Sequence, residues 1–130
     1  MDIAKALAIS AHGMDAQTTR LRVIAENLAN QDTTGSSPGA DPYRRKTITF
    51  VPVDGGGVAV RSVGRDRTPF EQKYEPSHPA ADPQGYVKLP NVNSFVEMMD
   101  MREAERSYSA DLDVMQITRQ MFARTLDLLK

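Results

Sequence analysis

The sequence predicts a mainly α-helical protein with a small β unit, in which long N- and C-terminal helices form a coiled-coil-like bundle around a turn-rich central β insertion. Near both ends, apolar residues recur at alternating steps of three and four, the spacing that keeps one helix face against a partner. All glycines and prolines except Gly13 lie between Gly35 and Pro90, where they interrupt any long helix. We therefore expect an N-terminal helical segment (1–30), a central region with a β-hairpin (31–90) and a C-terminal helix (91–130).

The N-terminal helix is expected to run from Asp2 to about Asn30, because this segment is rich in good helix formers and contains no proline. Its apolar stripe includes two polar positions, Ser10 and Gln17, which often set register and partner choice in helix seams. The apolar members of this predicted assembly stripe are Ile3, Leu7, Met14, Leu21, Ile24 and Leu28.

The central region is expected to hold a β-hairpin. The segments 43–53 and 58–63 are rich in β-favouring residues, and the Asp-Gly-Gly-Gly sequence at 54–57 between them is typical of a hairpin loop. A further extended segment is predicted at 86–89, with no assigned strand partner.

The C-terminal helix is expected to begin at Ser94 and to continue to near Lys130, because no glycine or proline follows Pro90. Ser94 and Glu97 have the spacing of a capping box, in which each side chain bonds the other residue's backbone N–H. The stripe of this helix has polar entries at Glu105 and Arg119. Its predicted assembly residues are Met98, Met101, Tyr108, Leu112, Met115, Phe122, Leu126 and Leu129.

The two stripes leave two states of association open. Burying the apolar residues of the first stripe would contribute roughly 10–18 kcal/mol, at about 1.5–3 kcal/mol for each large side chain. Ordering the backbone of that helix costs on the order of 30–60 kcal/mol, only partly offset by hydrogen bonds. This balance favours folding coupled to assembly, whereas the alternative is an antiparallel helical hairpin within a monomer. Periodicity alone does not determine how many helices pack together.

Composition argues against several functional classes. The net charge of −1, from 16 basic and 17 acidic residues, offers no broad attraction to nucleic acid or to an anionic membrane surface. The absence of cysteine removes disulfides and thiolate metal sites. No apolar run approaches the roughly 18 residues of a membrane span, and we expect no cleavable signal peptide and no direct membrane insertion.

No group of residues predicts catalysis, a cofactor or a metal site. His12 and Asp15 share a helix face, but two ligands leave a metal site incomplete. His78 has no neighbouring nucleophile motif, so a turn-stabilising role is expected. The basic run 44–46 is too short to indicate nucleic-acid binding and is expected to form a solvated or inter-subunit face. We therefore expect a protein that is not an enzyme.

Several segments resemble the FlgC family of bacterial flagellar basal-body proximal rod proteins. The segments that carry the resemblance are 26–30 (ENLAN), 42–46 (PYRRK), 74–79 (YEPSHP), 85–93 (GYVKLPNVN) and 106–108 (RSY). The first and last resemble signatures shared by flagellar axial proteins, whereas 74–93 is similar to FlgC itself. The chain departs from the usual pattern at Ser109 and Asp111, where glutamine and asparagine are common.

The resemblance implies a structural subunit of the basal-body rod, which crosses the periplasm and transmits torque. It further implies export without cleavage by the flagellar type III apparatus, and partners that are other copies of the chain and other rod proteins. The terminal stripes would carry the polymer contacts. The residues expected to shape a central joint are Tyr43, Arg44, Arg45, Tyr74, Pro76, Tyr86 and Asn91. The competing hypothesis is a monomeric helical-hairpin adaptor or secretion chaperone that binds a single client.

Overall fold

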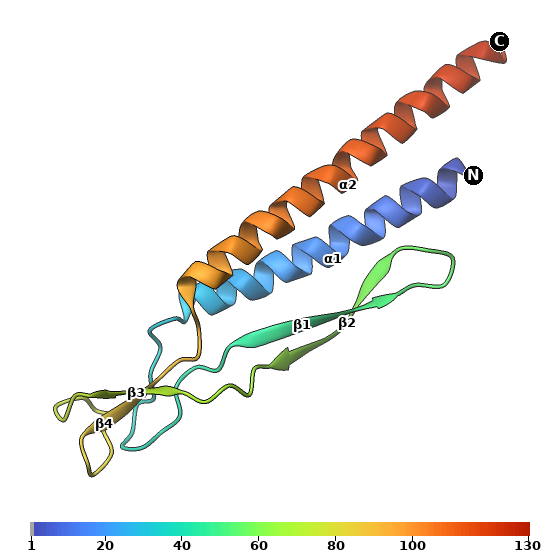
Figure 1. Ribbon diagram of the computed structural model, residues 1–130. Coiled ribbons are helices and arrows are strands. Elements are labelled where there is room, and N and C mark those ends of the chain that lie inside the picture. The colour runs from blue at the N-terminus through green and yellow to red at the C-terminus, as the bar shows by residue number, and fades with distance from the viewer. Residues whose placement is uncertain (1) are drawn as a thin grey trace. The chain divides into compact units, whose positions relative to one another are not determined.

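The computed structural model describes residues 2–130, and its first element is the long helix α1 (Ile3–Ala29) (Figure 1). Asp2 caps this helix, because its Oδ1 accepts the backbone N–H of Ala4 at 3.0 Å. At the other end, the side-chain amide of Asn30 donates to the Glu26 carbonyl at 2.9 Å, which satisfies a carbonyl of the last turn. The predicted extent of the first helix is confirmed.

Strands β1 (Lys46–Pro52) and β2 (Val58–Arg65) form a two-stranded sheet, as the hairpin prediction required. In the turn, the N–H of Val53 donates to the carbonyl of Gly57 at 3.1 Å, and the turn glycines 55–57 all have positive φ. The prediction that the first strand begins at residue 43 is wrong. The N–H of Tyr43 donates to the carbonyl of Thr33 and that of Arg45 to the side chain of Asn91, so these two N–H groups do not bond to β2.

A second antiparallel sheet pairs β3 (Glu71–Tyr74) with β4 (Tyr86–Leu89), with Glu71 opposite Leu89 and Tyr74 opposite Tyr86. The extended segment predicted at 86–89 is therefore confirmed, whereas its partner was not predicted. All residues of β3 are exposed, so neither face of this strand is buried. Its sequence accordingly lacks the alternation of apolar and polar residues that identifies a strand.

Helix α2 (Ser94–Leu128) begins at the predicted residue, but its cap differs from the prediction. Asn93 is the cap, since its Oδ1 accepts the N–H groups of Phe95 at 3.0 Å and Val96 at 3.3 Å. The carboxylate of Glu97 points elsewhere and bonds Arg45. The predicted capping box between Ser94 and Glu97 is therefore wrong, because a stronger charged partner holds the Glu97 side chain.

The chain forms two compact units. The first unit comprises the residues up to Arg22, Ile48–Ser62 and Met101–Lys130, and the second comprises Val23–Thr47 and Val63–Asp100. Within residues 2–130, the buried hydrophobic side chains are few and none is larger than isoleucine. They are Ala16 and Ala104 in the first unit, and Val23, Ile24, Ala80 and Val87 in the second.

In the first unit, α1 and α2 run antiparallel. Arg20 forms an ion pair with Glu103 at 3.5 Å, and Gly13 faces Asp111 further along the pair. A side chain at Gly13 would collide with the Asp111 carboxyl group, whose Cγ lies 2.9 Å from the ideal Cβ position. Glycine at this position therefore lets the carboxyl group of α2 approach the backbone of α1 closely.

None of the helices in residues 2–130 combines the length and apolar character needed to cross a membrane.

Candidate assembly site

Along the paired part of the helices in the first unit, most side chains of the predicted stripes are half-buried. These half-buried stripe residues are Ile3, Leu7, Met14, Leu21, Met101, Tyr108, Leu112 and Met115. The two polar stripe positions of α1 are also covered: Ser10 is buried and Gln17 is half-buried. The Gln17 Oε1 is buried with no hydrogen-bond partner among the described residues, so this amide weakens the seam that it shares with its apolar neighbours.

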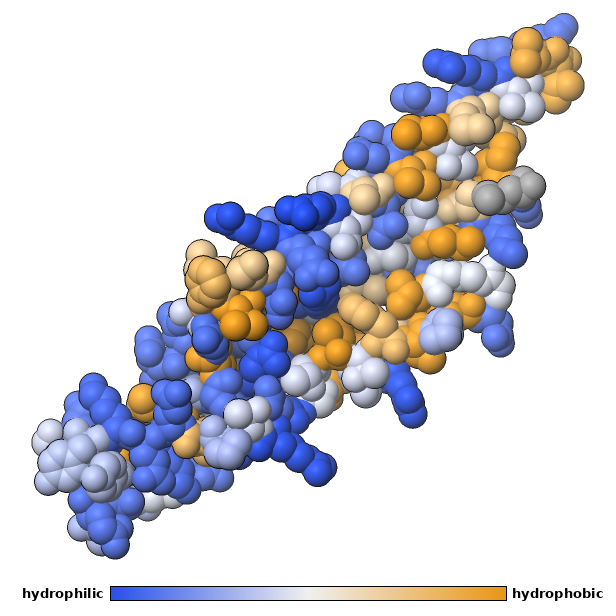
Figure 2. All heavy atoms as spheres, viewed as in Figure 1, coloured by the Kyte–Doolittle hydropathy of each residue, from blue (hydrophilic) through white to orange (hydrophobic). Residues whose placement is uncertain are grey.

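The stripe of α2 continues past the paired part of the first unit. Because Gly13 faces Asp111 in an antiparallel pair, Ile3 at the start of α1 is level with about residue 121 of α2. Phe122, Leu126 and Leu129 lie beyond that level and are 47%, 46% and 78% exposed. Figure 2 shows hydrophobic surface at this C-terminal end of the chain. We call these three side chains the inner stripe, because they continue the helix face that packs on α1.

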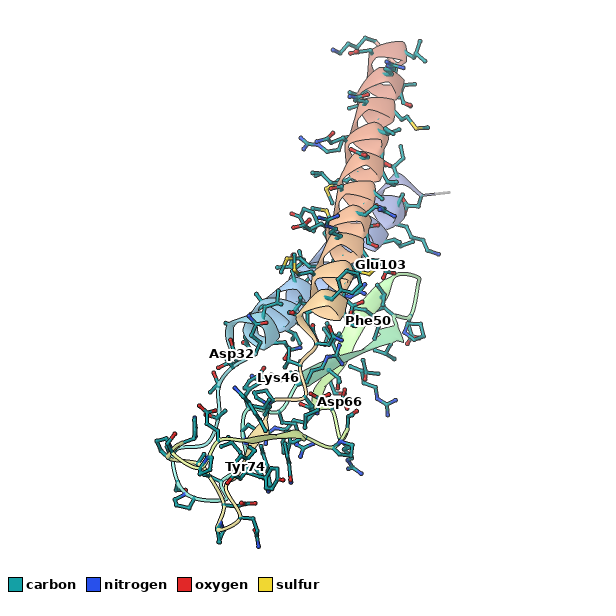
Figure 3. The ribbon with its side chains drawn as sticks, turned by 60° about the vertical axis from the view of Figure 1, so that its left-hand side comes forward. Asp32, Lys46, Phe50, Asp66, Tyr74 and Glu103 are labelled. Carbon is teal, nitrogen blue, oxygen red and sulfur yellow. The ribbon has the colours of Figure 1, made fainter. Side chains whose placement is uncertain are left out.

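The second unit is centred on Arg45, which binds three carboxylates. Its Nε donates to Glu97, a Nη lies 3.4 Å from Asp66 Oδ2, and the other Nη lies 3.7 Å from Asp100 Oδ2. Glu97 is fully buried, whereas the Arg45 side chain is 23% exposed. Figure 3 labels Asp66, which is one of these three carboxylates, and Lys46, which follows Arg45 in the sequence. The charge on Arg45 therefore compensates a carboxylate that has no access to water.

Asn27, which is buried near the end of α1, connects the helices to the chain around β1. Its side-chain amide donates to the Lys46 carbonyl at 2.9 Å and to Glu97 Oε2 at 3.5 Å. Its oxygen accepts the Lys46 N–H and the Tyr43 hydroxyl, each at 2.8 Å. All hydrogen-bonding positions of this buried amide are thus used, which explains why a polar side chain is stable there.

Asn91 and Arg44 hold the segment that follows β2. The oxygen of Asn91 accepts the Arg45 N–H at 2.7 Å, while its NH₂ donates to the carbonyls of Asp66 and Thr68, each at 3.1 Å. The Arg44 guanidinium donates to the Asp66 carbonyl at 2.9 Å and stacks over the Phe70 ring at 4.1 Å. We call Asn27, Arg45, Asp66, Asn91 and Glu97 the Arg45 cluster.

Within the Arg45 cluster, Arg45 and Asp66 are both stabilised in their charged forms. Burial opposes the charge on Arg45, but the hydrogen bonds and charges of Glu97 and Asp66 outweigh it and raise the pKa of Arg45. Hydrogen bonds from the Thr68 hydroxyl and N–H, with a smaller contribution from Arg45, lower the pKa of Asp66. A lowered folded-state pKa means that Asp66 contributes stability at neutral pH, which is lost as the pH falls through that pKa.

The structure divides the residues predicted for the central joint between two places. Tyr43, Arg44, Arg45 and Asn91 meet around the Arg45 cluster. Tyr74, Pro76 and Tyr86 meet instead at the turn between β3 and β4, where the two tyrosine rings pack edge to face with centroids 5.3 Å apart.

The prediction that residues 44–46 form a solvated or inter-subunit face is wrong for Arg45, which is bound within its own chain. Lys46 also has an internal partner, Glu26, at 2.7 Å. Of the remaining stripe residues, Ile24 is buried and Leu28 half-buried, whereas Met98 is 53% exposed.

Sequence reasoning missed the roles of Glu97, Asn27 and Asp66. One signal was present: Glu97 lies four residues before Met101 and shares its helix face, so it places a carboxylate on an apolar stripe. A charge in such a position requires a buried counter-charge. The expected turn role of His78 is confirmed, because its Nδ1 accepts the Ala80 N–H at 3.0 Å.

Asp111 provides a pH-dependent contribution to the helix pair of the first unit. Burial raises the pKa of Asp111, so its ionised form destabilises the pair at neutral pH and protonation relieves this cost. We predict that Asp111→Asn raises the melting temperature of the dilute chain at pH 7, as followed by far-UV circular dichroism. The gain should shrink as the pH falls through the raised pKa, and Asp113→Asn on the exposed side should produce none. An unchanged or lower melting temperature for Asp111→Asn would contradict this account.

Comparison with known proteins places this arrangement in a family. Residues 7–35 match the family "Flagella basal body rod protein", and residues 84–128 match "Flagellar basal body rod FlgEFG protein C-terminal". The chain is 53% identical over 127 residues to the flagellar basal-body rod protein FlgC of Agrobacterium fabrum, which covers 94% of this chain and 91% of that protein. The FlgC of Salmonella typhimurium is 41% identical, with 92% of each chain covered. The FlgC of Aquifex aeolicus is 40% identical, with 98% of this chain and 97% of that protein covered.

The matched ranges contain most of α1 and all of α2, together with Asn27, Asn91 and Glu97 of the Arg45 cluster. The resemblance inferred from the sequence is therefore confirmed over nearly the whole chain. The protein belongs to the FlgC family of flagellar basal-body rod proteins, a family of structural proteins and not of enzymes.

Proposed function

We propose that this rod subunit polymerises through its terminal helices and so forms part of the torque-transmitting shaft that crosses the periplasm. Its partners in the shaft are other copies of the chain and other flagellar rod proteins. It reaches the shaft through the flagellar type III export apparatus. The inner stripe and the paired stripes of α1 and α2 carry the contacts between subunits.

The observation that carries this proposal is the imbalance between buried and exposed apolar side chains. Among residues 2–130, no buried hydrophobic side chain is larger than isoleucine, whereas Phe122, Leu126 and Leu129 are about half or more exposed on α2. Burying a large apolar side chain is worth about 1.5–3 kcal/mol. These side chains are not buried within the chain itself. Neighbouring subunits bury them, and assembly gains the corresponding free energy.

The Arg45 cluster suits a subunit under torsional load. Its hydrogen bonds and ion pairs join the end of α1, the start of β1, the segment after β2 and the start of α2. Such a network has short-range, directional contacts on several segments, so relative displacement of those segments breaks several bonds at once. Within the second unit, the network therefore supplies stiffness that a small apolar core does not.

Passage through an export channel is compatible with the same features. The chain has no cysteine, so no disulfide cross-link resists unfolding before export. Its small core provides little free energy to hold the terminal helices in place before assembly.

Hydrogen exchange distinguishes a subunit ordered by assembly from an adaptor that is complete as a monomer. In the dilute chain, we predict rapid exchange at backbone amides of α1 and of α2 beyond Met101, and slow exchange at the same amides in isolated basal bodies. The matched control is the β3–β4 sheet, whose protection should change less. A dilute chain that stays monomeric and fully protected at every concentration would favour the adaptor or secretion chaperone instead.

A further inference from the structure

The turn of the β1–β2 hairpin contains a chemically reactive pair of residues. Asp54 is followed by Gly55, and no other aspartate or asparagine of the chain precedes a glycine. The backbone nitrogen that follows an aspartate can attack the side-chain carboxyl carbon and close a five-membered succinimide ring. Because glycine has no Cβ to hinder that approach, Asp54 has the least hindered neighbour of any aspartate in the chain.

The fold leaves both partners of this reaction accessible. Asp54 and Gly55 are exposed, and the Asp54 carboxylate forms no hydrogen bond or ion pair within residues 2–130. The turn is closed by the N–H groups of Gly56 and Val53, which donate to backbone carbonyls at 3.0 Å and 3.1 Å, whereas the Gly55 N–H donates to no acceptor within the same range of residues. Ring closure at Gly55 therefore breaks no hydrogen bond of the attacking nitrogen.

The fold protects a second candidate for the same reaction, Asn93. Of the asparagines, Asn93 has the smallest following residue, Ser94, and an asparagine closes the same ring with loss of ammonia. Its Oδ1, however, accepts the N–H groups of Phe95 and Val96 at 3.0 Å and 3.3 Å, so the side chain is held at the start of α2. Attack on Asn93 requires this cap to open first, whereas attack on Asp54 does not.

We infer that Asp54 is the site at which this chain forms isoaspartate. The Gly55 nitrogen bonds to Cγ of the protonated Asp54 carboxyl group, whose hydroxyl leaves with the proton of the nitrogen as water. Water then adds to the ring carbonyl that was the backbone carbonyl of Asp54, and the bond from that carbon to the nitrogen breaks. The main chain now runs through Cβ and Cγ, and the former backbone carbonyl is a free carboxylate. The product is an isomer of the original chain, and no oxidant or reductant takes part.

Isoaspartate in this turn disturbs the contact between the turn and α1. An ideal Cβ on Gly56 would lie 2.9 Å from Ile9 Cδ1, and one on Gly57 would lie 3.4 Å from His12 Cβ, so the turn backbone rests closely on the helix. The isomerised main chain contains one additional carbon between Asp54 and these glycines. Because closely packed groups leave no space for an added atom, the turn is displaced and α1 loses its support at Ile9 and His12.

Prolonged incubation of the purified chain at neutral pH tests the site. Trypsin releases the two candidates in separate peptides, 47–61 with Asp54 and 89–102 with Asn93. Chromatography separates the isoaspartyl form of the first, fragmentation in the mass spectrometer locates it, and deamidation raises the mass of the second. In the folded chain, Asp54 should convert at least about tenfold faster than Asn93, which reacts only while its cap is open. In guanidinium chloride the cap is lost, and Asn93 should convert at least as fast as Asp54, because an amide is attacked more readily than a carboxylate.

Two substitutions at Asp54 test the chemistry at an exposed position. Asp54→Glu should form no isomer at this position, since a glutamate would have to close a six-membered ring. Asp54→Asn should convert faster than the parent chain and release ammonia. After equal incubation, the parent chain should melt at a lower temperature than before, whereas the melting temperature of Asp54→Glu should not change.

Three results would overturn the inference. The first is an incubated chain with no isoaspartate at residue 54, and the second is one with as much isoaspartate at its other aspartates. The third is deamidation of Asn93 in the folded chain as fast as conversion at Asp54. A converted chain that melts as the fresh chain does would refute the effect on α1.

Discussion

Leu112→Asp is expected to abolish rod assembly while the chain is still synthesised. Leu112 is half-buried on the paired face of α2, where an aspartate would bring a negative charge next to apolar side chains and to half-buried Asp111. Loss of the leucine contacts and desolvation of the new charge together cost about 3–5 kcal/mol in the helix pair. Electron microscopy of basal bodies and immunoblotting of whole cells measure the two outcomes separately.

Two further variants separate folding of the helix pair from contact between subunits. Leu21→Asp disturbs the same pair from α1 and should give the same defect. Leu126→Asp changes an exposed residue of the inner stripe, so it should leave the dilute chain unchanged and still reduce assembly. Gln120→Asp, at an exposed position on the polar side of α2, serves as the control and should assemble normally. Basal bodies of normal number and length from Leu112→Asp would count decisively against assembly through the terminal helices.

Arg45→Met is expected to destabilise the second unit by about 3–5 kcal/mol, because it leaves the fully buried Glu97 carboxylate without its counter-charge. Glu97→Gln should cost less, at about 1–2 kcal/mol, since Arg45 keeps Asp66 and Asp100 as partners. Thermal unfolding and the exchange rates of amides in β3 and β4 report the loss.

A double substitution tests whether the effect arises from the unpaired charge. Arg45→Met combined with Glu97→Leu removes both charges, so it should be more stable than Arg45→Met alone. Asp32→Asn, in an exposed loop of the same unit, is the control and should have little effect. If the loss of stability in the double variant equalled the sum of the losses in Arg45→Met and Glu97→Leu measured separately, the ion pair would not be the source of the stability.

Local patterns predicted the elements of this fold where the pattern itself is the physical cause. Helix α2 begins at Ser94 because no glycine or proline follows Pro90 and Asn93 supplies a cap, and both conditions act within a few residues. The turn at 54–57 depends on glycines that adopt positive φ, which is likewise a local requirement.

The Arg45 cluster could not be predicted in the same way. Glu97 and Asn27 are separated by 70 residues, and Arg45 and Glu97 by 52, so no local spacing relates them. The spacing of Ser94 and Glu97 suggested a local role for Glu97 in a capping box. Instead, the Glu97 carboxylate binds Arg45, which comes from a distant segment. Strand β3 escaped prediction for a similar reason: its exposed residues carry no alternation, and only pairing with β4 makes it a strand.

By itself, the sequence determined the two long helices, the hairpin, the apolar stripes and the family to which the protein belongs, since periodicity, backbone preference and motifs act over short separations. Only the tertiary structure decided which side chains remain available to other subunits. Burial depends on how far α1 extends along α2. Because α1 begins at Ile3, the inner stripe of α2 lies beyond that level and is exposed, although its pattern equals that of the covered residues before it. For the same reason, Arg45 became an internal counter-charge once folding brought Glu97 to it.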